Sequence, residues 1–321
     1  MAKLTIIGDP HVKNKNLDQI NKLFDLIEEY GNPTLLTGDV FDTKEVIRGK
    51  CLNLVYTRIK NSKLLFTILV GNHDYFNLEC EDHSLKVLSG LENVSIVEEL
   101  TSLGENIYGI PYMHDISKLK ATLKKIPKDS VLFGHLDVMS FDYGNGYLSE
   151  SGLDLKDLKK FKKVISGHYH KYQVKNNLTY IGTPFSHSFG ESNQDKFIGI
   201  FDMDTYEMEL IRTPFASHIT VNINCDDPNP SMEGYCDDDY VRVIFSGTQD
   251  NIAKARAKYT FPDDAKIIER PNDEFMNNVS IDETADNFVK FKEWAKEIRG
   301  LDPEITQLGV DILEAVKWLN Q

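Results

Sequence analysis

Five apolar runs in this chain end in a glycine, and the residue after each glycine is of a type that binds metals. Glycine lets the backbone turn sharply where the next side chain is presented. In α/β folds the C-terminal ends of buried strands meet at one edge of the sheet, where binding sites form. Junctions ending in Asp, Asp, Asn, His and His therefore predict one polar site at such an edge. The junctions are Ile7-Gly8-Asp9, Thr37-Gly38-Asp39, Val70-Gly71-Asn72, Phe133-Gly134-His135 and Ser166-Gly167-His168.

Three of these junctions carry a second polar residue close behind the first, and a fourth is followed directly by His73. Residues i and i+2 of an extended segment point to the same side, so both members of a pair can reach one centre. Packing alone does not explain such recurrence, whereas a metal centre needs several of these side chains in one place. The pairs are Asp9 with His11, Asp39 with Asp42, and His168 with His170.

Between the junctions, strand patterns alternate with amphipathic helices. A helix is expected over Leu17–Tyr30, where apolar residues recur on one face and Gly31-Asn32-Pro33 ends the pattern. Strands that alternate with helices indicate a layered α/β domain whose strands are buried on both faces. The strands are expected at Leu4–Ile7, Thr34–Thr37, Leu64–Val70, Val131–Phe133, Lys163–Ile165, Leu178–Ile181 and Phe197–Asp202.

The pattern changes near Thr213-Pro214, after which acidic and turn-rich segments are common. A strand at Tyr240–Phe245, a helix at Asn251–Tyr259 and a strand at Ala265–Glu269 predict a small βαβ-like unit. Two amphipathic helices follow, of which the first aligns Phe288, Phe291 and Trp294 on one stripe. We therefore expect three segments, comprising residues 1–214, 215–275 and 276–321.

Composition limits the function. Of the 321 residues, 41% are hydrophobic, which excludes an intrinsically disordered chain. The formal net charge of −14 argues against a simple electrostatic nucleic-acid binder, which is expected to be basic. However, residues 1–200 carry a net charge of only −1, and residues 201–321 carry −13. The acidity is therefore remote in sequence from the predicted site.

Cysteine usage and hydropathy indicate the compartment. The four cysteines form no C-x-x-C pair, so we expect free thiols in a reducing environment. No apolar run approaches the roughly 18 residues of a membrane span. Charged and polar residues at Asp9 and His11 come too early for a signal peptide. The sequence thus predicts a soluble, cytoplasmic protein.

The ordered motifs from Asp9 to His170 resemble those of the calcineurin-like metallophosphoesterases. The resemblance implies a four-layer sandwich of two sheets flanked by helices, with a small α+β capping domain and C-terminal helices. It also implies two divalent ions. Mixed nitrogen and oxygen ligation without thiolates suits Mn²⁺, Fe or Zn²⁺, with Mg²⁺ as a further alternative, and the nuclease relatives favour Mn²⁺. By resemblance, one ion is held by Asp9, His11, Asp39 and His170, and the other by Asp39, Asn72, His135 and His168.

Within that superfamily the chain is most similar to DNA double-strand-break repair nucleases of SbcD type, including bacteriophage recombination exonuclease subunits. Asp42 is not followed by the Arg-Gly of Ser/Thr phosphatases, and Tyr180-Ile-Gly-Thr-Pro-Phe leads on to a nuclease-like Phe189-Gly190-Glu191. The resemblance implies a 3′–5′ exonuclease on double-stranded DNA ends that is also a single-strand endonuclease. It would act in recombination, repair or replication with an SbcC-type coiled-coil ABC ATPase, and it could form a homodimer.

The resemblance also assigns roles to single residues. His73 matches the catalytic histidine that stabilises or protonates the leaving oxygen. Asp42 matches the phosphatase residue that orients this histidine, although some nucleases carry His there. His187 is a candidate for the substrate path. Residues 215–275 would cap the DNA, and residues 276–321 would dock the ATPase through Phe288, Phe291 and Trp294, unless these pack on their own domain.

The same sequence features are compatible with other functions. The lysines Lys159, Lys160, Lys162 and Lys163 lead into the strand before His168, and they form either a DNA-phosphate contact or a solvated surface. The fold also supports phosphoprotein phosphatases and cyclic-nucleotide phosphodiesterases. A catalytically inactive scaffold subunit is the non-enzymatic alternative, but such a protein is expected to have lost ligands that this chain retains.

Overall fold

The computed structural model describes residues 2–44, 46–144, 146–230, 234–272, 307 and 309–310. The predicted docking residues Phe288, Phe291 and Trp294 lie outside these ranges. The chain divides into two compact units. One contains Met1–Thr220 and Tyr235–Val241, and the other contains Val221–Gly234 and Arg242–Gln321. The bounds 1–214, 215–275 and 276–321 stay predictions.

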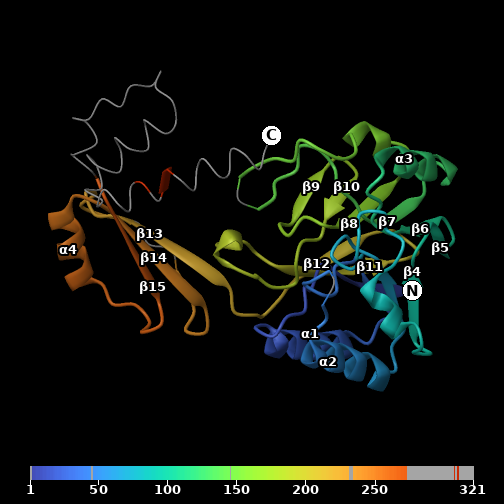
Figure 1. The fold of residues 1–321 in the computed structure, drawn as a ribbon, viewed down its shortest axis with the longest axis horizontal. Helices are drawn as coiled ribbons and strands as arrows, with labels where there is room; N and C mark the ends of the chain where they lie inside the picture. Colours follow the sequence, from blue (N-terminus) through green and yellow to red (C-terminus); the bar gives the residue numbers. More distant parts are fainter. Residues whose placement is uncertain are drawn as a thin grey trace. The chain divides into compact units, whose positions relative to one another are not determined.

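Two six-stranded mixed sheets form the first unit (Figure 1). Seven of these strands were predicted, with ends within two residues of those observed, and the other five were not predicted. The first sheet has the order β12-β11-β1-β2-β3-β4, with β1 Lys3–Ile7, β2 Thr34–Leu36, β3 Phe66–Leu69, β4 Val94–Val97, β11 Phe197–Asp202 and β12 Met208–Arg212. The second has the order β5-β6-β7-β8-β10-β9, with β5 Thr101–Gly104, β6 Ile107–Ile110, β7 Val131–His135, β8 Lys163–Gly167, β9 Gln173–Lys175 and β10 Leu178–Tyr180.

Helices cover the outer faces of these sheets. The helices are α1 Leu17–Tyr30, α2 Gly49–Asn61 and α3 Ile116–Lys125, and short 3₁₀ turns span Ser84–Leu88, Leu155–Leu158 and Phe189–Glu191. Helix α1 has the predicted bounds because its buried stripe ends at Gly31. This glycine adopts φ 65° and donates its N–H to the carbonyl of Ile27. Helix α3 begins after Asp115, whose carboxylate accepts the N–H groups of Ser117 and Lys118.

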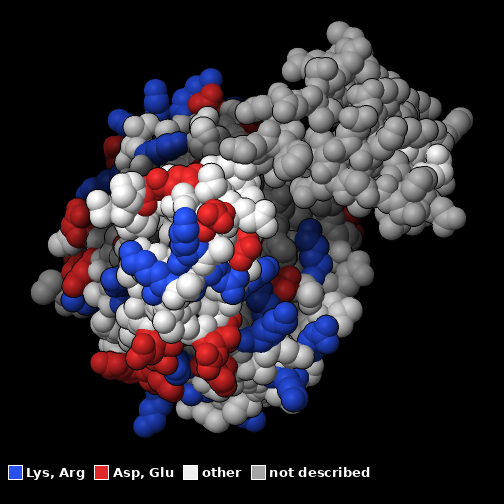
Figure 2. Space-filling view, turned by 90° about the vertical axis from the view of Figure 1, so that its left-hand side faces the viewer, with Lys and Arg blue, Asp and Glu red and all other residues white. Residues whose placement is uncertain are grey.

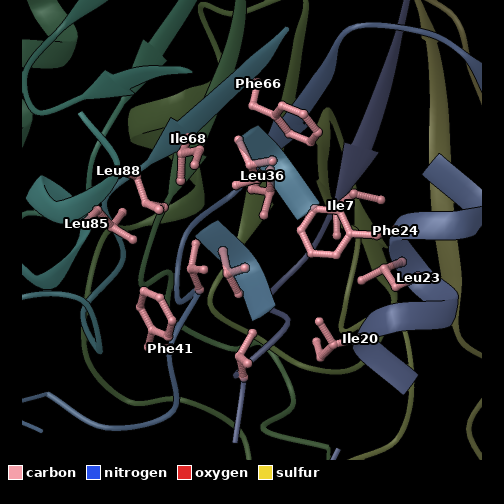
Figure 3. Packing of buried hydrophobic residues seen from close by; sticks show 14 of the residues in the cluster. Ile7, Ile20, Leu23, Phe24, Leu36, Phe41, Phe66, Ile68, Leu85 and Leu88 are labelled. Carbon is pink, nitrogen blue, oxygen red and sulfur yellow. The ribbon is translucent and has the colours of Figure 1, made fainter. Parts of the chain in front are cut away.

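The first unit has four layers, in which two sheets lie between an outer layer of α1 and α2 and an outer layer of α3. Three apolar clusters hold these layers together. One packs α1 and α2 on the first sheet, where Ile20, Leu23 and Phe24 meet strand residues such as Ile7 and Phe66 (Figure 3). A second packs α3 on the other sheet. The third lies between the sheets and is lined by residues of both. The predicted α/β sandwich is confirmed.

Parallel pairing brings the ends of the junction strands together. Strands β1, β2 and β3 run parallel, and so do β7 and β8. In each sheet the glycine junctions therefore open at the same edge.

The second unit contains a three-stranded sheet, β13-β14-β15, and helix α4. Strand β14 (Tyr240–Gly247) and strand β15 (Lys266–Pro271) are parallel and joined by α4 (Gln249–Lys258), which confirms the βαβ unit. Strand β13 (His218–Asn224) was not predicted, although its buried Val221 and Ile223 alternate with exposed residues. No helix in the described ranges is long and apolar enough to cross a membrane, and the four cysteines are free thiols.

Candidate metal centre

Three of the predicted ligands have left-handed backbones. His11, Asp39 and His168 adopt φ values of 40°, 49° and 96°. Side chains other than glycine rarely occupy this region, and such residues concentrate at functional sites, where the surrounding fold holds them in place. The junctions thus aim these three side chains at one point at a conformational cost.

Two of the junction glycines permit close approach between the segments. A Cβ on Gly71 would lie 2.2 Å from Asp39 Oδ1, and a Cβ on Gly167 would lie 2.3 Å from Asp9 Oδ1. Real Cβ atoms do not approach oxygen so closely, so any larger residue would displace a carboxylate. Glycine is needed at these junctions because the carboxylates of Asp9 and Asp39 occupy the space of its missing side chain.

The first group of ligand atoms belongs to Asp9, His11 and His170, which lie within 4.8 Å of one another. The Nε2 atoms of His11 and His170 are 3.0 Å apart. His170 Nδ1 lies 2.9 Å from Glu191 Oε1, so its Nδ1 proton is donated there and Nε2 presents a lone pair to His11. Buried His11 Nδ1 has no hydrogen-bond partner among the described residues.

The second group surrounds Asn72. Its Oδ1 is 2.8 Å from both His135 Nε2 and His168 Nδ1. Asp39 Oδ2 lies between the groups, 3.5 Å from His135 Nε2 and 3.6 Å from His11 Nε2. The structure therefore brings all seven predicted ligands together, with Asp39 in the position of a shared ligand.

Electrostatics at this centre are dominated by burial and by carboxylate–histidine pairs. Burial raises the pKa of Asp9 to about 6 against the opposing effect of His135. Burial also opposes ionisation of Asp39, but His135 and His11 outweigh it and hold its pKa well below the usual range. Burial would lower the pKa of His135, yet Asp39 and Asp9 raise it to about 9.

These donors fit a pair of divalent cations. Two carboxylates, an amide oxygen and four imidazoles converge with separations of 2.8 to 3.8 Å between their polar atoms, although most of these atoms are hydrogen-bond acceptors. His135 Nδ1 faces the carbonyl of Thr37 at 2.8 Å, which leaves Nε2 directed at Asn72 and Asp39. A cation satisfies such converging acceptors, and no thiolate takes part. The donor set thus suits Mn²⁺, Fe, Zn²⁺ or Mg²⁺.

His73 stands beside this centre as predicted. Its backbone N–H donates to Asp39 Oδ1 at 2.7 Å, and its half-buried ring meets the ring of His11 edge-on. Nδ1 lies 3.0 Å from the backbone carbonyl of Asp42, not from its carboxylate. The carboxylate instead pairs with Lys13 at 3.1 Å and lies 3.9 Å from His11 Nδ1. Asp42 therefore contacts His73 through its main chain.

A buried ion pair supports His170 from behind. Glu191 Oε2 lies 2.7 Å from Lys196 Nζ, and both side chains are less than one tenth exposed. Lys196 also donates to the carbonyl of His170 and to Thr183 Oγ1. Burial opposes ionisation of Glu191, but His170 and Lys196 hold its pKa far below the usual range. Lys196 and Thr183 were missed in the sequence because no junction marks them.

Asp74 was also missed, although it stands two residues after Asn72. Its fully buried carboxylate accepts the N–H groups of Val40 and Gly71, at 3.1 and 2.9 Å. Burial, followed by the charge of Asp39, raises its pKa to about 8. Asp74 thereby joins the two loops that carry Asp39 and Asn72.

Two further rings border the centre. Tyr112 stacks on His168 with ring centroids 6.0 Å apart. His187 packs edge-on against His11 at 5.4 Å, and its buried Nδ1 has no partner in the described part of the chain. Burial lowers the pKa of His187 to about 3, so it packs as a neutral ring. This places His187 at the first ligand group.

The predicted DNA-contacting lysines are not at the centre. Lys163 begins β8, whereas His168 follows its other end. Lys163 pairs with Glu207, Lys162 lies over the ring of Tyr206, and Lys160 donates to the carbonyl of Ile126. The length of β8 separates these lysines from the ligands.

The fold and site together define a class of protein. Two packed sheets that gather aspartate, asparagine and histidine ligands for two cations form a metal-dependent phosphoesterase. The family model for calcineurin-like phosphoesterases matches residues 2–172. The chain belongs to this family.

Comparison with individual proteins is more specific than the family model. The chain is 28% identical over 214 residues to exonuclease subunit 1 of Enterobacteria phage T4, covering 63% of this chain and 62% of the phage protein. It is 29% identical over 212 residues to protein 078R of Invertebrate iridescent virus 3, named as a phosphoesterase, covering 60% of each. The matches thus span about 60% of these relatives. A solved archaeal phosphodiesterase superposes with a TM-score of 0.38 at 16% identity, over 65% of this chain and 99% of that one.

Proposed function

We propose that this protein is the nuclease subunit of an SbcD-type complex, a 3′–5′ exonuclease on double-stranded DNA ends and a single-strand endonuclease. The convergence of seven ligands with His73 beside them carries the proposal. Similarity to the phage T4 exonuclease subunit favours DNA over a phosphoprotein or a cyclic nucleotide. Mn²⁺ is the proposed ion, and recombination, repair or replication in the cytoplasm is the proposed setting.

The residues of the chain have separable roles in hydrolysis. When bound, two divalent ions neutralise phosphate charge and lower the pKa of a water that attacks phosphorus. His73 donates Nδ1–H to the Asp42 carbonyl, which leaves Nε2 to reach the leaving 3′-oxygen. Glu191 fixes the tautomer of His170, so that Nε2 remains available as a ligand.

A nuclease assay tests the activity. Purified protein is incubated with Mn²⁺ and duplex DNA labelled at either the 3′ or the 5′ end, alongside His73→Ala. We expect early release of the 3′ label as mononucleotide. We expect this rate to be at least about 100-fold lower in the variant. Turnover of a phosphoprotein or a cyclic nucleotide, with intact DNA, would reject the nuclease in favour of those enzymes. Absence of turnover on every substrate would favour the scaffold.

The partner is tested separately. We propose that residues 276–321 dock a coiled-coil ABC ATPase through Phe288, Phe291 and Trp294. Deletion of that segment is expected to abolish co-purification with the ATPase while nuclease activity on a short substrate persists. Unchanged co-purification would assign those helices to internal packing. Light scattering of the full chain tests the proposed homodimer.

A further inference from the structure

A cavity of about 370 Å³ adjoins the metal centre, between the segment after β1 and the loop before α2. Its charged lining consists of one carboxylate, Asp42, and three basic side chains, Lys13, Lys15 and Arg48. Asp42 links this cavity to the centre, because its Oδ1 lies 3.1 Å from Lys13 Nζ and 3.9 Å from His11 Nδ1. The cavity is therefore one side chain away from a metal ligand.

The basic groups of this cavity are available to an anion. Lys15 and Arg48 are exposed, and neither forms an ion pair with another described residue. Among the described residues, Lys13 forms an ion pair with Asp42 alone, and the side chain of Asp42 is about one third exposed. Val12, Phe41 and Ile47 supply an apolar floor between the charges. A cluster of cations beside an apolar surface suits a sugar-phosphate chain.

A second cavity near the centre has the opposite charge balance. It measures about 620 Å³, and its lining includes Tyr112, which stacks on His168. Four carboxylates line it against two lysines, namely Glu79, Glu98, Glu99 and Asp115 against Lys118 and Lys125. Phosphates are repelled by such an excess of carboxylates. A polyanion that reaches the centre is thus favoured on the Lys13 side.

The one face drawn in Figure 2 does not mark a path for DNA. On the face drawn in Figure 2, basic and acidic side chains of the described residues both occur, and acidic groups gather at the lower left. The neighbourhood of the centre is therefore the better guide to where a nucleic acid strand lies.

We propose that Lys13, Lys15 and Arg48 form a subsite for a non-scissile phosphate of the same DNA strand whose scissile phosphate lies at the metal centre. This inference rests on the proposed nuclease function and adds the direction in which the strand leaves the centre. A substrate with a single phosphodiester cannot occupy the metal centre and the subsite at the same time. The subsite therefore contributes to oligonucleotide binding alone.

Two substrates separate the subsite from the centre. The triple variant Lys13→Ala, Lys15→Ala, Arg48→Ala is compared with the unchanged full chain on an end-labelled oligonucleotide and on bis(p-nitrophenyl) phosphate. The KM for the oligonucleotide is expected to rise about tenfold or more. The slope of log KM against log salt is expected to fall by about 1 or more. Turnover of the small phosphodiester is expected to remain within about twofold.

A matched control removes the same charge elsewhere. The variant Lys3→Ala, Lys22→Ala, Lys63→Ala changes three exposed lysines at the start of β1, on α1 and before β3, and is expected to leave the oligonucleotide KM unchanged. An equal rise in both variants would overturn the subsite, since it would reflect net charge alone. A loss on both substrates would also overturn it, because these side chains would then support the centre itself.

Other outcomes distinguish the two proposals. An unchanged oligonucleotide KM in the first triple variant rejects the subsite and leaves the nuclease function intact. If the unchanged protein hydrolyses only the small phosphodiester, the nuclease function fails, and the subsite fails with it. The double variant Lys15→Ala, Arg48→Ala spares the Lys13–Asp42 pair, so it repeats the test if the triple variant folds poorly.

Discussion

Replacing Lys196 with methionine tests whether the buried pair behind His170 stabilises the fold and the metal centre together. The Lys196 and Glu191 side chains are only 4% and 8% exposed, and Nζ lies 2.7 Å from Oε2. Methionine keeps much of the volume of the lysine stem and removes the charge. Glu191 then remains buried with His170, Thr183 and the backbone N–H of His187 as its partners.

The size of the effect follows from opposing terms. At 2.7 Å the attraction is about 6 kcal/mol with an effective dielectric constant of about 20. Desolvation of both groups offsets most of this attraction in the intact pair. Removal of one partner, however, leaves a buried charge and costs about 3–5 kcal/mol. Because Glu191 keeps three other partners, we expect a loss near the lower end, about 3 kcal/mol.

Urea unfolding in the presence of a chelator measures the loss without the metal. The control Lys171→Met breaks the more exposed pair with Asp142, for which we expect less than about 1 kcal/mol. The double variant Glu191→Gln, Lys196→Met is expected to be more stable than the sum of its two single changes predicts. Calorimetry is expected to show Mn²⁺ affinity about 10–100-fold weaker in Glu191→Gln. Additive losses, with Lys196→Met below about 1 kcal/mol, would refute the reasoning.

Three further changes test the centre. Asp39→Asn removes the shared ligand and is expected to weaken Mn²⁺ binding by at least about 100-fold in calorimetry; unchanged affinity would contradict a shared position. His73→Gln is expected to reduce phosphodiester turnover by about 10²–10⁴-fold with an unchanged unfolding midpoint, and a large fall in the midpoint would indicate a structural role. Gly167→Ala forces a carboxylate aside and is expected to cost about 1–3 kcal/mol in urea unfolding. Gly49→Ala, whose Cβ meets nothing within 4 Å, is the control and is expected to be neutral or slightly stabilising.

The sequence predicted what depends on local order along the chain. Helix α1 has its predicted bounds because an apolar stripe and Gly31 together define a helix and its end. The ligands were predictable for a related reason, since each follows a strand end and parallel strands deliver those ends to one edge. The calcineurin-like family was recognisable from those junctions alone.

What escaped prediction depends on contacts across the fold. Lys196 reaches Glu191 through a turn that no pattern marks. The backbone carbonyl of Asp42 contacts His73. Every residue has such a carbonyl, so the residue type at this position could not predict the contact. The lysines before β8 adjoin His168 in sequence but stand at the other end of its strand. Sequence proximity to a ligand therefore indicates spatial proximity only when no regular element separates the two residues.

The net charge of −14 is compatible with the proposed substrate once the location of the charge is considered. Most of the excess lies in residues 201–321, and residues 1–200 are nearly neutral. At the centre, two divalent ions would bring about four positive charges against the carboxylates of Asp9 and Asp39, which makes the site locally cationic. The proposed subsite at Lys13, Lys15 and Arg48 extends that charge along one strand. Binding of DNA by this chain alone should therefore be weak and sensitive to salt, and we expect tight binding to need the proposed partner.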